Sequence, residues 1–219
     1  MIVNVFVPDA ASLSVVEQYR KLPPERRVSQ YWSDPAVSTF KAAAKTHYLA
    51  EQAQTCCYCR KVFPSNNMRI WDLDHILARS VFPEFMFEPR NLAISCVDCN
   101  GAKSDKDTSR QSTYRYFPKR SASYLIVHPH FDEFDDHISV FAGYIYTPRA
   151  GSAKGKETIS RCNLTRFADV FEGRKGRVCD SRYEADVAQL LFAEDKAVAR
   201  AAMRKLMTAF EEDDDDFED

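Results

Sequence analysis

Apolar residues recur at helical spacing in one part of the chain and follow strand-like patterns in another. Asp34-Pro35 pairs a capping side chain with proline at the first helical position, and the apolar residues that follow predict a helix to about Gln54. Residues 124–127 and 138–146 have the β-branched and aromatic composition of strands, the second alternating in part. The chain is therefore expected to combine helices with short strands.

The C-terminal third is predicted to be mainly helical. Residues 151–156 are interpreted as a loop that carries glycine and lysine, and Asn163 is expected to cap a short helix. Ser181 and Glu184 have the spacing of a capping box, and the helical pattern after them extends to about Phe210.

Composition is that of a soluble globular protein, because 45% of the 219 residues are hydrophobic and 28% are charged. No apolar stretch is long enough to span a bilayer, so no membrane association is expected. Residues 1–8 lack the basic region and cleavage site of a secretory signal, and they resemble a short strand instead. An odd number of cysteines, seven, argues against a disulfide framework, so a cytoplasmic location is expected.

Charge is distributed unevenly along the chain. Residues 211–219 contain eight acidic residues and no basic one, which indicates a solvated, disordered tail. Without them, 30 basic residues face 24 acidic ones, a net charge of +6 for the remainder. A modestly basic body is compatible with contact to phosphate backbones, although an ordinary charged surface explains it as well.

Four cysteines occur as two Cys-x-x-Cys pairs, Cys56/Cys59 and Cys96/Cys99. Two such turns provide the four soft ligands that tetrahedral zinc prefers, and a closed shell of thiolates indicates a structural rather than catalytic metal. Cys57 could replace Cys56, but the Cys56/Cys59 spacing is the usual one. The remaining cysteines are expected to be buried thiols: Cys57, Cys162 and Cys179.

The segment between the two pairs contains residues suited to phosphodiester hydrolysis. His75 is a candidate general base, since its ordinary pKa is near neutral. Asp74 and Asn100 offer hard oxygen ligands for Mg²⁺ or Mn²⁺. Asn91 could order the loop or the imidazole, and Lys103, one helical turn beyond Asn100, could contact a phosphate.

The order Cys-x-x-Cys, Asp-His-Ile, Asn-Leu and Cys-x-x-Cys-Asn-x-x-Lys resembles the zinc-bearing branch of the HNH endonucleases. This resemblance implies a ββα-metal core with His75 as general base at the end of the first strand. It also implies Asp74 and Asn100 as metal ligands, with Asn100 in the helix, and Asn91 as a loop-ordering residue near the second strand.

The sequence departs from the family pattern at two positions. Ala78 replaces a proline that many relatives have after Asp-His-Ile, which could loosen the loop. Asn100 replaces the last histidine of the family name and keeps an oxygen ligand. We thus predict an α+β fold with four parts: an N-terminal part (1–55), an HNH core stapled by zinc (56–107), a mixed and helical part (108–210) and the acidic tail (211–219).

Segments outside the core give weaker signals. Basic and aromatic residues alternate in 104–120, as in nucleic-acid-binding surfaces, yet a charged face above core aromatics explains them equally well. The histidines and acids of 128–137 could form a second metal site, although turn and surface positions are the favoured interpretation. The pattern His-Pro-x-Phe-Asp in this segment, with residues 155–159, resembles nucleases of Septu-type antiphage systems, some of them associated with retrons. That resemblance implies a defence effector working with an ATPase partner.

The leading hypothesis is a metal-dependent HNH endonuclease that hydrolyses nucleic acid, with DNA favoured over RNA or tRNA. A zinc-dependent nucleic-acid-binding module without catalysis is one alternative. A subunit that mainly assembles on an ATPase is another.

Overall fold

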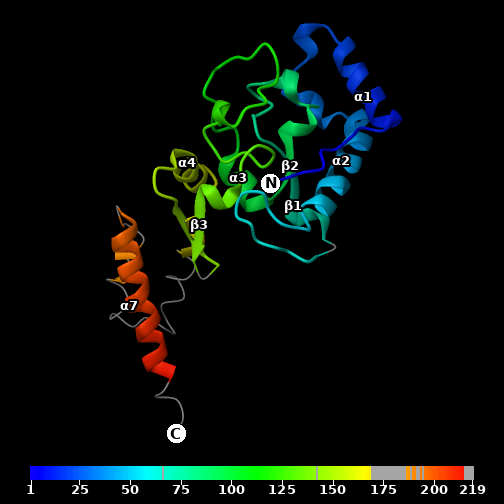
Figure 1. Cartoon of the computed structure of the whole chain (residues 1–219). Helices are drawn as coiled ribbons and strands as arrows, with labels where there is room; N and C mark the ends of the chain where they lie inside the picture. The colour runs from blue at the N-terminus through cyan, green and yellow to red at the C-terminus, as the bar shows by residue number, and fades with distance from the viewer. Residues whose placement is uncertain are drawn as a thin grey trace.

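The structure, a computed structural model, describes residues 1–65, 67–141, 143–168, 186–187, 189–190, 193 and 195–214, with side chains described as far as Thr208. These residues form a mixed fold in which helices surround two small antiparallel sheets (Figure 1). The expected combination of helices and strands is confirmed.

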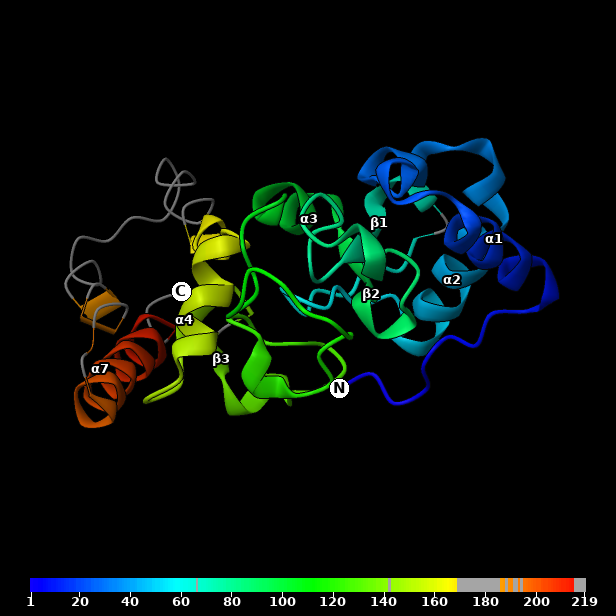
Figure 2. The same cartoon turned by 90° about the horizontal axis from the view of Figure 1, so that it is seen from above.

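A hairpin followed by a helix forms the centre of the fold. Strand β1 (Trp71–His75) pairs antiparallel with β2 (Leu92–Cys96), and α3 (Val97–Lys103) follows β2 directly. Seen from above, the hairpin lies between α3 and α2 (Ser38–Glu51) (Figure 2). Because side chains alternate along a strand, the hairpin presents one face to each of the two helices.

The N-terminal part covers the hairpin with aromatic side chains. Helix α1 (Ala10–Lys21) was not predicted; Asp9 caps it by accepting from the Ser12 amide. The predicted helix from Asp34 is confirmed, since Asp34 caps a 3-10 turn that leads into α2. The helix ends at Glu51, before Ala53 and Gln54 adopt positive φ. Four aromatic rings from this part pack around Phe87, which lies between β1 and β2 in the sequence: Tyr19, Tyr31, Trp32 and Phe40.

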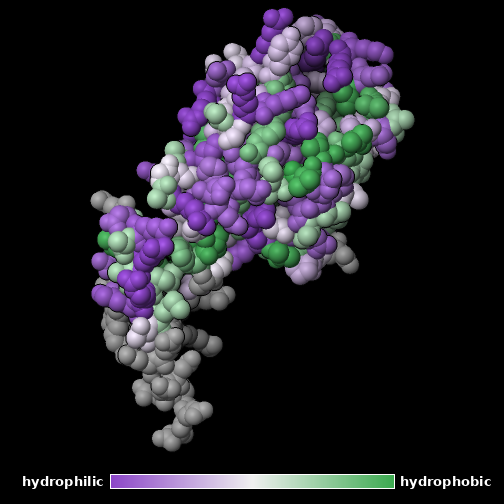
Figure 3. All heavy atoms as spheres, viewed as in Figure 1, coloured by the Kyte–Doolittle hydropathy of each residue, from purple (hydrophilic) through white to green (hydrophobic). Residues whose placement is uncertain are grey.

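Two of the predicted strands are absent from the described residues. Residues 1–8 are extended but join no sheet; the Ile2 amide donates to the Pro129 carbonyl. Residues 124–127 make only one isolated bridge, between Ser109 and Tyr124, so that prediction is wrong. Their apolar character reflects burial in the core, which a strand-like composition does not distinguish from pairing. In the view of Figure 3, apolar side chains gather along the N-terminal segment beside α1 and α2.

The segment 138–146 is a hairpin rather than one strand. Strand β3 (Ile138–Phe141) pairs antiparallel with β4 (Ile145–Pro148), and Gly143, with φ of +77°, lies in the turn between them. The turn divides the alternating pattern into two short strands.

The predicted loop at 151–156 is also wrong. Helix α4 (Ala153–Arg161) begins there, because the Ser152 hydroxyl caps it by accepting from the Gly155 amide. Glycine at 155 lowers helix propensity, but a Cβ at this position would lie 2.1 Å from the His137 carbonyl oxygen. Close packing of α4 on that carbonyl therefore requires glycine.

The end of α4 corrects a further expectation. Asn163 has φ of +48°, a left-handed conformation typical of the residue after a helix, whereas an N-cap is extended. Residues 166–168 are helical, and the rest of the predicted helix lies outside the described residues.

Helix α7 (Lys196–Asp214) forms most of the described C-terminal part. Asp195 caps it by accepting from the amides of Ala197 and Val198, so this helix begins well after the predicted capping box. Ser181 and Glu184 lie outside the described residues. Residues 211–214 are helical, which corrects the start of the predicted disordered tail, and 215–219 are not described.

One hydrophobic core cluster contains residues from Ile2 to Leu164, across the predicted boundaries at 55 and 107. Leu190, Ala202 and Leu206 form a second, smaller cluster. The division into four parts remains a prediction. Throughout the described ranges, no helix combines the length and the apolar composition that crossing a bilayer requires.

Candidate metal and catalytic centre

Four cysteines converge where the turn after α2 meets the start of α3. We call Cys56, Cys59, Cys96 and Cys99 the cysteine cluster; all four are buried, and their sulfur atoms lie within 4.8 Å of one another. A zinc ion bound at about 2.3 Å from each sulfur in a tetrahedron requires sulfur separations of about 3.8 Å. The Sγ atoms of Cys59 and Cys96 are 4.0 Å apart, so the donor set fits a structural metal such as zinc.

Backbone hydrogen bonds close the first Cys-x-x-Cys turn and attach it to the hairpin. The Cys57 amide donates to the Ile94 carbonyl of β2, and the Cys56 amide donates to the Lys61 carbonyl. Cys56 rather than Cys57 joins the cluster, as the spacing predicted. Cys57 and Cys162 are buried, and burial raises the pKa of both thiols, so they are expected to stay protonated. Cys179 lies outside the described residues.

Arg166, which the sequence did not single out, lies against the cysteine cluster. Its Nη2 is 3.2 Å from Cys99 Sγ and 4.0 Å from Cys96 Sγ. Its Nη1 donates to the carbonyls of Cys162 and Asn163, which fixes the guanidinium in place. Because four thiolates outweigh the charge of one dication, a cation here offsets negative charge at the metal site.

Asp74 is buried on the face of β1 that α3 covers. Its Oδ2 accepts a hydrogen bond of 2.6 Å from the Tyr58 hydroxyl, and its Oδ1 is 3.2 Å from Lys103 Nζ. Burial raises the pKa of Asp74, whereas the Lys103 ammonium and the Tyr58 hydroxyl act in the opposite direction. Each oxygen of the Asp74 carboxylate therefore interacts with one side chain, Oδ2 with Tyr58 and Oδ1 with Lys103.

Asn100 lies on α3 opposite the same face of β1. Its side-chain amide donates to Asp72 Oδ2 at 2.9 Å. Asp72 and Asp74 are two residues apart in β1 and so share a face. Three side chains with hard oxygen atoms, Asp72, Asp74 and Asn100, thus gather between β1 and α3, and the sequence had given no role to Asp72.

His75 is the last residue of β1, is 3% exposed and leaves the strand on the other face. Its Nε2 lies 3.0 Å from the Met86 carbonyl oxygen, and its ring packs edge-on against Trp32 with centroids 4.5 Å apart. A carbonyl only accepts, so Nε2 carries the hydrogen and Nδ1 keeps the lone pair. Burial, with a smaller contribution from Arg79, lowers the pKa of His75 to about 3, which keeps the ring neutral.

Lys103 connects His75 to Asp74 through the backbone. Its ammonium is buried and donates to the His75 carbonyl at 3.0 Å and the Ser104 carbonyl at 3.3 Å, besides its ion pair with Asp74. The expected contact between Lys103 and a phosphate remains a prediction. In this conformation the ammonium faces these three protein acceptors.

Asn91 immediately precedes β2 and is fully buried. Its Oδ1 accepts from the Leu77 amide at 2.8 Å, and its Nδ2 donates to the carbonyls of Leu77 and Phe85. The Asn91 amide thereby joins the loop that follows His75 to the entry of β2.

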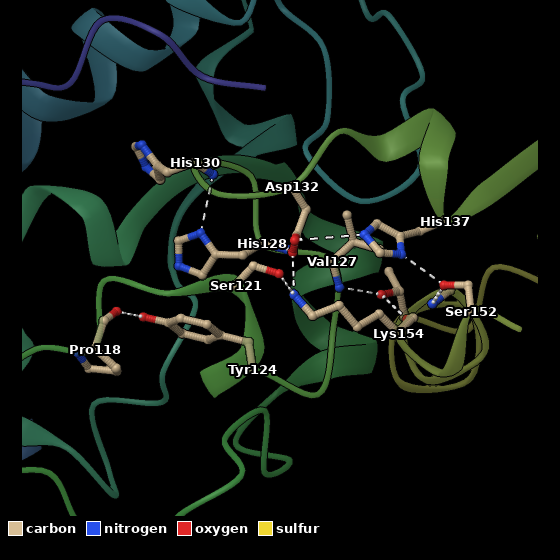
Figure 4. Close-up of polar contacts among 12 residues, drawn as sticks. Pro118, Ser121, Tyr124, Val127, His128, His130, Asp132, His137, Ser152 and Lys154 are labelled. Atoms are coloured by element: carbon tan, nitrogen blue, oxygen red, sulfur yellow. Dashed lines mark hydrogen bonds and ion pairs between the residues drawn. The ribbon is translucent and has the colours of Figure 1, made fainter.

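Figure 4 shows a second group of polar residues, which come from the segment 128–137 and from α4. We call His128, His130, Asp132, His137 and Lys154 the histidine cluster. The surface positions favoured for this segment are wrong for His128, His130 and Asp132, which are buried. His130 does lie in a turn, and the other acids of the segment are exposed: Glu133, Asp135 and Asp136.

The histidine cluster is held by an ion pair and by hydrogen bonds to the backbone. Asp132 Oδ2 pairs with Lys154 Nζ at 2.5 Å and accepts from the His128 amide at 2.7 Å. His130 Nε2 donates to the Leu92 carbonyl at 2.8 Å, where β2 begins. The Asp132 carboxylate is already paired with Lys154, and His130 is hydrogen-bonded to the start of β2. These contacts stabilise the packing against the hairpin and do not favour a second metal site.

The fold and the site define a mixed α/β protein built around a four-cysteine cluster that could hold a structural metal such as zinc. No profile of a known protein family matches the chain. Among characterised proteins, the chain is similar to the Septu protein PtuB of Bacillus thuringiensis, with 25% identity over 127 residues. The similar region covers 58% of this chain and 43% of that protein, so the chain matches less than half of the relative's length.

Proposed function

We propose that the protein is a metal-dependent HNH endonuclease that hydrolyses phosphodiester bonds in nucleic acid, with DNA favoured over RNA. One observation carries the proposal: β1, β2 and α3 bring Asp74 and Asn100 to the two sides of one strand–helix contact, beside the cysteine cluster. His75, next to Asp74 at the end of β1, carries a neutral imidazole on the other face of the strand.

In this proposal His75 accepts the proton of the attacking water through Nδ1. The Met86 carbonyl holds the Nε2 hydrogen and so fixes the tautomer that leaves Nδ1 as the base. A pKa of about 3 makes the buried ring a weak base. Since burial is the main cause, water that enters with the substrate would raise this pKa toward its ordinary value.

Asp74 and Asn100 would hold Mg²⁺ or Mn²⁺, which supplies electrostatic stabilisation of the phosphate in the transition state. Asp72 orients the Asn100 amide so that its carbonyl oxygen is left for a ligand. We assign Lys103 to support of the site, because its ammonium faces Asp74 and the His75 carbonyl, and we assign Asn91 to ordering the loop.

The similarity to Septu protein PtuB supports a role in antiphage defence. We propose that the protein is a defence effector that acts with an ATPase partner in the cytoplasm, and that the acidic residues 211–219 contribute to that contact or cover the basic body.

A nuclease assay tests the proposal. The purified, zinc-loaded chain is incubated with plasmid DNA or tRNA in Mg²⁺ or Mn²⁺, with and without a candidate ATPase partner. His75→Ala is expected to lower the cleavage rate by about 10²–10⁴-fold, the contribution typical of a general base. Asp98→Asn, an exposed change on α3, serves as the matched control and is expected to leave the rate unchanged. Equal cleavage by wild type and His75→Ala would refute the assignment.

Two observations favour a second candidate, a nucleic-acid-binding or assembly subunit without catalysis. His75 is nearly inaccessible, and Asp74 already has both oxygens engaged by Tyr58 and Lys103. This candidate predicts binding of nucleic acid, or of the ATPase, without cleavage under every metal condition.

A further inference from the structure

Tyr58 lies inside the first Cys-x-x-Cys turn and reaches out of it to the proposed catalytic centre. Its side chain is fully buried, and its hydroxyl donates to Asp74 Oδ2 at 2.6 Å. The cysteine cluster flanks it closely, because Cys56 and Cys59 lie two residues before it and one residue after it. The proposed ligand of the catalytic metal is thus hydrogen-bonded to a residue of the structural metal's own turn.

The other oxygen of Asp74 is held from the second Cys-x-x-Cys segment. Lys103, 3.2 Å from Asp74 Oδ1, lies four residues after Cys99 in the same helix. The cysteine cluster joins these two segments, and Asp74 sits between their side chains. Movement of either segment would therefore change the orientation of the carboxylate.

We propose that Tyr58 is a positioning residue through which the cysteine cluster orients Asp74 for the catalytic metal. This inference rests on the proposed function. A carboxylate has about four lone-pair sites, so hydrogen bonds from Tyr58 and Lys103 leave others free for a cation. Partners of this kind fix the orientation of a ligand, and their loss commonly weakens metal binding by about 10–100-fold.

Two other roles would place the same hydrogen bond in the structure. Tyr58 could simply satisfy a buried carboxylate, in which case its loss would affect stability alone. It could also compete with the metal for Asp74, in which case its loss would strengthen metal binding. These three roles differ in the sign of one measurable quantity, the affinity for Mn²⁺.

The test compares Mn²⁺ binding to wild type, Tyr58→Phe and Asp74→Asn. Full-length, zinc-loaded protein is titrated without nucleic acid and followed by electron paramagnetic resonance, with zinc content and melting temperature measured in parallel. Tyr146→Phe is the matched control: its buried hydroxyl donates to the Cys59 carbonyl at 2.6 Å, so it also loses a phenol hydrogen bond beside the cysteine cluster.

We expect Tyr58→Phe to weaken Mn²⁺ binding by about 10–100-fold while Tyr146→Phe leaves it unchanged. A second outcome is that wild type binds Mn²⁺, Asp74→Asn abolishes this binding, and Tyr58→Phe binds Mn²⁺ as tightly as wild type or more tightly. This outcome would overturn the positioning role and leave the proposed function intact. Wild-type protein without any Asp74-dependent Mn²⁺ site would overturn both.

A second probe covers the case in which Tyr58→Phe does not fold. Replacing Tyr58 with 3-fluorotyrosine keeps the shape of the ring and makes the hydroxyl a stronger donor. Tighter Mn²⁺ binding than that of wild type supports the inference, and binding that is equal or weaker overturns it.

Discussion

The ion pair between Lys154 and Asp132 joins α4 to the segment 128–137, and its contribution to the stability of the protein can be tested directly. Both side chains are buried, and Lys154 Nζ lies 2.5 Å from Asp132 Oδ2 and 2.9 Å from the Ser121 hydroxyl (Figure 4). Lys154→Met keeps most of the side-chain volume and removes the charge. It leaves the Asp132 carboxylate buried without its cation.

The expected loss follows from that stranded charge. Removing one partner of a buried ion pair typically destabilises a protein by about 3–5 kcal/mol. For a protein of about 150–250 residues, 1 kcal/mol corresponds to about 2–4 °C in melting temperature. We therefore expect Lys154→Met to melt about 6–20 °C below wild type at neutral pH.

The assay is thermal unfolding of the zinc-loaded protein, followed by circular dichroism. Lys156→Met, an exposed change in the same helix, is the control and should shift the melting temperature by no more than a few degrees. Adding Asp132→Asn to Lys154→Met should recover much of the loss, because the amide keeps an acceptor for the His128 amide and strands no charge. A Lys154→Met protein as stable as the control would refute the reasoning, as would a double variant less stable than the single one.

Other predictions concern the helix contact, the buried imidazoles and the metal. Gly155→Ala should destabilise the protein by about 1–3 kcal/mol, since the new Cβ would lie 2.1 Å from the His137 carbonyl oxygen; unchanged chemical denaturation would contradict this. Burial lowers the pKa of His130 to about 4, so the unfolded chain binds more protons below about pH 6.5, and stability should fall from pH 6.5 to 4. His130→Gln, which can still donate to Leu92, should show a shallower decline, and an identical pH profile would argue against this origin. Elemental analysis should find zinc in wild type and little or none in Cys99→Ser, whereas a full complement of zinc in the variant would exclude a four-thiolate site.

Spacing along the chain was sufficient for features that depend on neighbours in sequence. The two Cys-x-x-Cys pairs predicted a four-sulfur site and the choice of Cys56 over Cys57, because such a turn presents both thiols to one point. Asp34-Pro35 predicted the start of a helix for a similarly local reason: the cap and the first turn involve adjacent residues.

Only the tertiary structure decided which distant side chains meet. Tyr58 and Asp74, Arg166 and Cys99, and Asp132 and Lys154 are joined by contacts whose partners are 16, 67 and 22 residues apart. Composition cannot predict these contacts, because the sequence does not distinguish a polar residue that is solvated from one that is buried with a partner.

The same limit explains the errors at 124–127 and 151–156. Apolar residues in the first segment are buried without forming a strand, and glycine in the second is required by a carbonyl of another segment. Local pattern therefore determined which four cysteines come together and part of the helices. Burial against remote segments determined the environment of His75 and Asp74, on which their proposed chemistry depends.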